Sequence, residues 1–152
     1  MTKDAYRPPA RALVAYYGLL EMVHLVVLAW AGIRVLQSGA LGFPALPPPG
    51  GWDAQVVPFL VATAVLDAVN VLLAWAFVYG YWTRARWAWW VGGITLTATL
   101  YSAVVFAAGT VASGAWQQHP VGYLALTVVA LPVFALAFFY SLWGITGQFD
   151  PT

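Results

Sequence analysis

Four long apolar runs restrict what this 152-residue chain can fold into. A membrane-spanning helix needs about 20 consecutive, mainly apolar residues, which cover about 30 Å of hydrocarbon. Stretches of that length, separated by short polar or Gly- and Pro-rich segments, lie at residues 13–36, 56–81, 87–112 and 120–145. The sequence therefore predicts an all-α fold, in which a single transmembrane domain over residues 1–152 forms a bundle of four helices.

Composition excludes most other classes of protein. Only 7% of the residues are charged and 62% are hydrophobic, whereas a soluble domain carries about 25% charged residues. A formal net charge of +1 gives no basic surface for nucleic acid, so no nucleic-acid partner is expected. The chain has no Cys, which excludes disulfide scaffolds, thiol catalysis and Cys-ligated metal centres.

The basic residues predict the orientation of the bundle. With four spans, both termini and the loop between the second and third spans share one side of the membrane. Basic residues accumulate on the cytoplasmic side, and this side would carry Lys3, Arg7, Arg11, Arg84 and Arg86, against Arg34 alone on the other. We therefore expect an integral, multi-pass membrane protein with cytoplasmic N- and C-termini.

The longest connection, residues 37–55, would then be external. Its three consecutive prolines, 47–49, should be extended, and the two glycines that follow should bend the chain. Phe43, Leu46 and Trp52 would allow this loop to fold back onto the membrane surface as a lid, and a plain linker with interfacial anchors is the alternative. Tyr16, Tyr17 and most tryptophans are expected as interfacial anchors.

Four polar residues lie deep inside the first two spans. Glu21 and His24 lie in the first and Asp67 and Asn70 in the second, and each pair is spaced i, i+3 on one helix face. At the standard helical rise all four lie roughly 12–20 Å from the same membrane surface. Antiparallel neighbours would thus bring Glu21 toward Asn70 and His24 toward Asp67.

Energetics favour a functional role for the ionisable members of this set. An acid at the centre of a membrane helix costs about 2.5–3.5 kcal/mol on the insertion scale. An interhelical hydrogen bond returns only about 0.6 kcal/mol on average. Glu21, His24 and Asp67 are therefore predicted as catalytic residues, because intramembrane ionisable groups are functional candidates by default. Purely structural pairing is the alternative, and it applies best to Asn70.

The third span adds a stripe of hydroxyl groups. Its members, Thr95, Thr99 and Ser102, are spaced i, i+4, i+7 along one helix face. Hydroxyl groups in membrane helices often bond only to the backbone of their own helix. Trp75 lies deeper than the other aromatic residues and is a further pocket candidate. The predicted ligand-binding residues are Asn70, Trp75, Thr95, Thr99, Tyr101 and Ser102.

No metal or cofactor is predicted. The spacing of Glu21 and His24 is that of the Glu-x-x-His pair in di-iron bundles. Those sites need about twice as many carboxylates as this chain places in its spans.

Six features of this layout recur in a known family. They are His24 midway along the first helix, an external loop ending Pro48-Pro49-Gly50-Gly51-Trp52, Asp67 in the second helix, the short basic loop Thr83-Arg84-Ala85-Arg86, hydroxyls around residues 95–102 and Pro132 in the fourth helix. In these the chain resembles the EXPERA family, which covers the emopamil-binding sterol isomerases and the sigma-2 receptor type of four-helix membrane protein.

The resemblance implies that Asp67 is the ligand-binding acid. Intramembrane acids of that family bind an amine or move a proton on a sterol-like ligand. The chain departs from the family pattern in two places. Glu21 lies one turn before His24 on the first helix, and the third helix has no acid or His of its own.

The leading hypothesis is an integral membrane protein that binds a small isoprenoid- or sterol-like ligand in an intramembrane pocket. Apolar walls with a few convergent polar groups are the usual pattern of a small-molecule site. In an enzymatic version, a buried acid protonates an alkene and a neighbouring base removes another proton. The expected partner is a membrane lipid or a small hydrophobic ligand.

Two alternatives come from other classes of function. The first is a non-catalytic subunit of a larger membrane complex or a homo-oligomer, which the small size and short termini favour. The second is a proton- or ion-conducting element. A conducting path needs polar residues throughout, whereas the outer halves of the spans have almost none apart from Arg34.

Overall fold

Four long helices make up almost all of the structure. The computed structural model describes residues 8–39, 41 and 46–145, and in this part of the chain every regular element is a helix. The elements are α1 (Pro8–Ser38), α2 (Val57–Trp82), α3 (Ala88–Ala112), the single-turn α4 (Ala115–Gln118) and α5 (Pro120–Ile145). All except α4 are long and apolar enough to cross a membrane, which confirms the predicted all-α, multi-pass architecture.

The predicted spans agree with these bounds except at the first helix. Three spans match α2, α3 and α5 to within one residue at each end. α1, however, begins five residues before the predicted start. The prediction followed the apolar run, and the first turn of α1, which contains Arg11, lies before that run. Proline is well tolerated in the first turn of a helix, so Pro8 and Pro9 favour this early start. The short α4 was not predicted, since a single turn carries no hydrophobic period.

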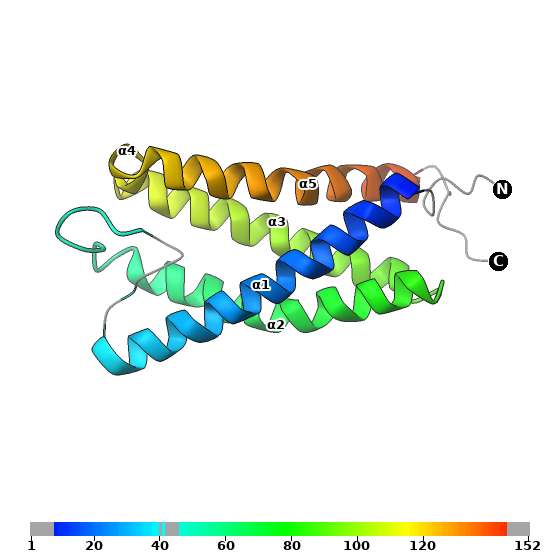
Figure 1. The fold of residues 1–152 in the computed structure, drawn as a ribbon, viewed down its shortest axis with the longest axis horizontal. Helices are drawn as coiled ribbons and strands as arrows, with labels where there is room; N and C mark the ends of the chain where they lie inside the picture. The colour runs from blue at the N-terminus through cyan, green and yellow to red at the C-terminus, as the bar shows by residue number, and fades with distance from the viewer. Residues whose placement is uncertain (1–7, 40, 42–45, 146–152) are drawn as a thin grey trace.

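The helices run up and down, and α1 crosses the others obliquely (Figure 1). We call the end of the bundle where α1 begins and α5 ends the terminal end, and the opposite end the loop end. α1 lies near α5 at the terminal end and diverges from it toward the loop end. α2 and α3 pack most closely, and α1 and α5 complete the bundle by contacting each other and the hairpin.

A tight turn joins α2 to α3, as the short second loop predicts. The amide of Ala85 donates to the carbonyl of Gly80 at 2.8 Å, and the amide of Arg84 donates to the carbonyl of Tyr81 at 3.2 Å. Arg84 has a left-handed φ of 56°, which reverses the chain directly after the helix. This turn makes the two helices antiparallel neighbours.

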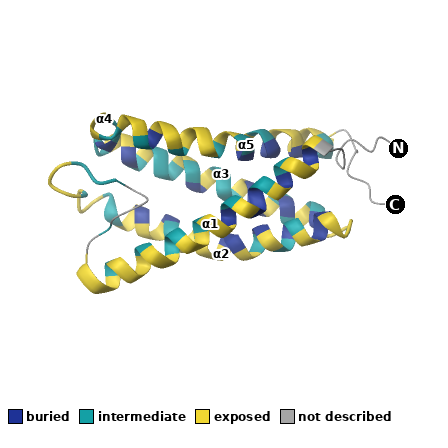
Figure 2. Ribbon diagram, in the orientation of Figure 1, coloured by how far each residue is buried: buried dark blue, intermediate teal, exposed yellow. Residues whose placement is uncertain are grey.

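The apolar core lies toward the terminal end. Tyr17, Phe77, Tyr81, Leu136 and Tyr140 are buried there. The rings of Phe77 and Tyr140 meet edge to face, with centroids 5.6 Å apart. Figure 2 shows that most of the remaining surface of the helices is exposed, and many of the exposed side chains are large and apolar. Such an apolar surface is suited to lipid rather than to water.

At the loop end, the connection after α1 folds back onto α5. The hydroxyl of Tyr123 donates to the carbonyl of Leu46 at 3.0 Å, and Nε2 of His119 lies 3.1 Å from the carbonyl of Pro47. The ring of Tyr123 also stacks on Trp116. Leu46 therefore packs against the bundle itself, whereas the fold of this loop onto a membrane surface stays a prediction, and Phe43 lies outside the described residues.

Close packing at the terminal end predicts a contrast between two adjacent glycines. A Cβ on Gly92 would lie 2.7 Å from the Phe77 ring, whereas a Cβ on Gly93 would meet nothing within 4 Å. Gly92→Ala should lower stability by about 1–3 kcal/mol through overpacking. Gly93→Ala should leave the melting temperature in detergent unchanged or raise it. Equal melting temperatures for the two variants would contradict this packing.

Candidate functional site

His24 lies between two carboxylates from two helices. Its Nδ1 is 3.8 Å from Oε2 of Glu21 on α1, and its Nε2 is 3.8 Å from Oδ2 of Asp67 on α2. The expected approach of His24 to Asp67 is thus confirmed. Both distances suit an ion pair but exceed the range of a direct hydrogen bond. The imidazole and the two carboxylates therefore keep hydrogen-bonding capacity for another group.

These three side chains line an intramembrane cavity of about 320 Å³. All four long helices contribute to its wall, and Thr99 and Ser102 of α3 are its other polar members. The eight remaining lining side chains are apolar. The volume lies at the lower end of the range of roughly 300–1,000 Å³ for small-molecule pockets, and the lining has their usual composition.

The cavity opens sideways between α1 and α5. These helices diverge toward the loop end (Figure 1). Val23 of α1 and Val129 of α5 both line the cavity, yet each is about half exposed. The side chain of His24 also remains 33% exposed, whereas that of Glu21 is only 4% exposed. An apolar molecule could therefore reach the polar groups directly from the hydrocarbon of a bilayer.

A second polar cluster lies next to the cavity and is internally satisfied. The hydroxyl of Tyr17 lies 2.8 Å from Thr95 Oγ1 and 2.9 Å from Thr99 Oγ1. The amide of Asn70 donates to Thr99 Oγ1 at 2.9 Å and accepts from Thr95 Oγ1 at 2.9 Å. We call these four residues the hydroxyl–amide network. Because its hydrogen bonds join α1, α2 and α3 to one another, this network stabilises the packing of the three helices.

Two sequence predictions change at this network. Tyr17, expected as an interfacial anchor, is fully buried, so that prediction is wrong. Its spacing of four residues before Glu21 puts both on one helix face, and this was the signal available in the sequence. Asn70, expected to meet Glu21, bonds to the hydroxyls of Thr95 and Thr99 instead. Of the network, only Thr99 also lines the cavity.

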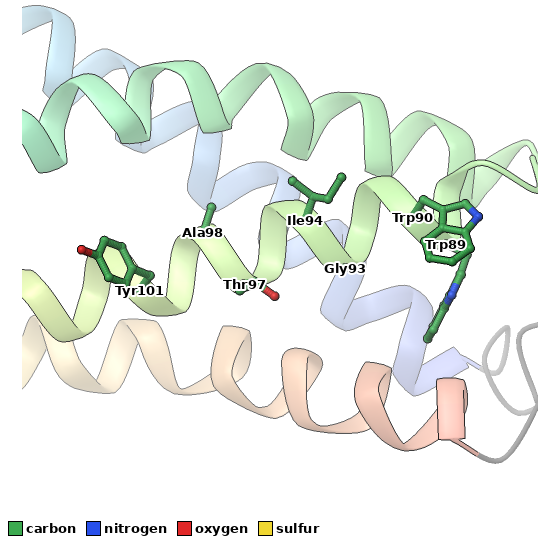
Figure 3. Close-up of a pocket in the computed structure, with 7 residues that line it drawn as sticks. All are labelled: Trp89, Trp90, Gly93, Ile94, Thr97, Ala98 and Tyr101. Atoms are coloured by element: carbon green, nitrogen blue, oxygen red, sulfur yellow. The ribbon is translucent and has the colours of Figure 1, made fainter.

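Two predicted pocket residues lie away from the acids. Trp75 is 41% exposed and Tyr101 is 63% exposed, and neither lines the cavity. Tyr101 belongs to a separate groove of about 690 Å³ on the outward face of α3 (Figure 3). Every residue lining that groove comes from α3, and the set runs from Trp89 to Tyr101. The structure therefore does not bring Trp75 or Tyr101 together with Glu21, His24 and Asp67.

The donor set does not favour a metal ion. Within the described part of the chain, no three His, Cys, Asp or Glu side chains converge closely enough to hold one. His24 contacts each carboxylate separately, at distances far longer than the roughly 2.0–2.2 Å of metal–ligand bonds to nitrogen and oxygen.

Comparison with protein-family models, with curated proteins and with solved structures gave no match for this chain.

Substitutions in the hydrogen-bonded network and at the cavity acids should have opposite effects on the stability of the fold. Asn70→Ala should lower the stability of the fold by about 1 kcal/mol, because it removes two interhelical hydrogen bonds of about 0.6 kcal/mol each. Asp67→Asn should leave stability unchanged or raise it, because it removes an acid that is costly to hold in the membrane. Thermal unfolding of both variants in one detergent measures the contrast. A loss for Asp67→Asn as large as that for Asn70→Ala would make Asp67 a structural residue.

Proposed function

We propose that this chain is a membrane protein that binds a small hydrophobic, isoprenoid- or sterol-like ligand in the cavity between its four long helices. The observation that carries the proposal is the meeting of Glu21, His24 and Asp67 in one mostly apolar cavity. Ionisable side chains are costly to bury in a membrane, and those that are found there usually act on a ligand or an ion. The sideways opening supports a ligand that arrives from the bilayer rather than from water.

The same groups could isomerise an alkene in the ligand by moving protons. One carboxylic acid donates its proton to an alkene carbon, and the resulting cation loses a different proton to the second carboxylate. His24 faces Glu21 with one ring nitrogen and Asp67 with the other, so it can carry the proton back between them. The carboxylate charge stabilises the intermediate cation. One proton enters and one leaves, so the product is an isomer of the substrate. The EXPERA resemblance implies the role of ligand-binding acid for Asp67.

Ligand retention tests the binding proposal. Asp67→Asn and Glu21→Gln should each lower the amount of co-purified lipid about tenfold, the size expected for losing a hydrogen bond to a charged group. Mass spectrometry of solvent extracts from equal amounts of purified protein gives the measurement. Asp53→Asn is the matched control, because Asp53 is an exposed acid outside the helices. Equal lipid in all four proteins, the wild type included, would refute the proposal.

We also propose that both termini face the cytoplasm, since the terminal-end loop carries Arg84 and Arg86. The chain has no native Cys, so a single introduced Cys reports its own side of the membrane. Gln118→Cys, at the loop end, should react with a membrane-impermeant maleimide in intact cells. Thr83→Cys, in the α2–α3 turn, should react only after permeabilisation. The reverse pattern would overturn this orientation.

A further inference from the structure

Ser102 differs from most other hydroxyl residues in the long helices. Thr63, Thr99, Thr110, Thr127 and Ser141 each donate to the backbone carbonyl four residues earlier. Ser102 could do the same on α3. Instead, within the described part of the chain, its Oγ has no partner at direct hydrogen-bond distance and geometry, although the residue is only 5% exposed. The polar group that it faces is the carboxylate of Asp67.

An unpaired buried hydroxyl is costly, particularly in a membrane. Ser102 lines the cavity together with Asp67, so the missing partner can be supplied by whatever occupies that space. A hydroxyl both donates and accepts, whereas an ionised carboxylate only accepts. A hydroxyl group satisfies both side chains, because it can accept a hydrogen bond from Ser102 and donate one to the carboxylate of Asp67.

The charges around the cavity restrict this group further. Two carboxylates line the wall, and no Lys or Arg does. A phosphate or carboxylate headgroup would lie against Glu21 and Asp67 with no basic side chain except His24 to offset it, and like charges brought together are strongly unfavourable. A ligand that diffuses in through hydrocarbon also carries a neutral group at much lower cost than a charged one. The observations thus favour an alcohol.

Size restricts the rest of the ligand. At about 30 Å³ per water-sized unit, a cavity of about 320 Å³ encloses on the order of ten non-hydrogen atoms. A rigid tetracyclic ring system is larger than this space. A narrow chain, by contrast, can place its polar end beside Ser102 and extend between α1 and α5 past Val23 and Val129.

We propose that the ligand is a neutral, flexible-chain alcohol, for which a prenyl alcohol serves as the probe, and that its hydroxyl accepts from Ser102 and donates to Asp67. This inference rests on the proposed function and narrows it. Ser102 is then a specificity-determining residue that distinguishes the alcohol from the corresponding hydrocarbon. No bond to carbon is made or broken in this binding step.

Binding to the full chain in lipid nanodiscs tests the inference with four matched probes: farnesol, farnesene, farnesyl phosphate and farnesylamine. Competition against radiolabelled farnesol measures their relative affinities. Farnesol should bind most tightly. Ser102→Ala should weaken farnesol about three- to tenfold, as expected for one net hydrogen bond, and leave farnesene unchanged. Ser141→Ala, whose hydroxyl is already bonded to the Ala137 carbonyl, is the matched control and should match the wild type.

Each other outcome overturns the inference in a distinguishable way. If farnesene binds as well as farnesol, or Ser102→Ala weakens both equally, the ligand hydroxyl is not recognised, and general hydrophobic binding survives. Tighter binding of farnesylamine or farnesyl phosphate would show a charged headgroup instead. If no probe binds, the alcohol is excluded, and the co-purified lipid of Asp67→Asn then decides separately whether the proposed function also fails.

Discussion

The cost of holding polar groups in hydrocarbon organises this bundle. Water is absent from the core of a bilayer, so each polar side chain in a span needs a partner from another helix, from its own backbone or from a ligand. Most hydroxyls here use their own backbone, as Thr63 and Ser141 do. The hydroxyl–amide network uses partners on other helices. Among the buried side chains of the described helices, Ser102 at the cavity is left without a partner at direct hydrogen-bond geometry.

The hydroxyl–amide network lies next to the cavity, and Thr99 belongs to both. Its hydroxyl bonds to Tyr17 and Asn70, while its side chain also lines the cavity that holds Asp67. A rigid network next to an open cavity is a useful arrangement, because binding groups act best when their neighbours fix their positions. The network thus supports the cavity from the terminal end, where the aromatic core around Phe77 also packs.

The path of α1 decides whether a cavity exists at all. Small residues permit close approach of helices near the terminal end. A Cβ added to Gly18 of α1 would lie only 3.1 Å from Cγ2 of Val78 on α2. Beyond that contact α1 diverges from α5, and its last turns are largely exposed (Figures 1 and 2). Val23 of α1 and Val129 of α5, which line the cavity, are each about half exposed.

The sequence by itself determined the membrane class, the four spans, the α2–α3 hairpin and the approach of His24 to Asp67. Those follow from hydropathy, from a short turn and from helical rise, which are all local properties. Only the tertiary structure decided that Tyr17 is buried, that Tyr101 faces outward and that Ser102 is left unpaired beside the acids. These depend on how each helix rotates about its own axis and crosses its neighbours. When a helix is apolar all round, no polar face specifies that rotation, so packing between helices sets it.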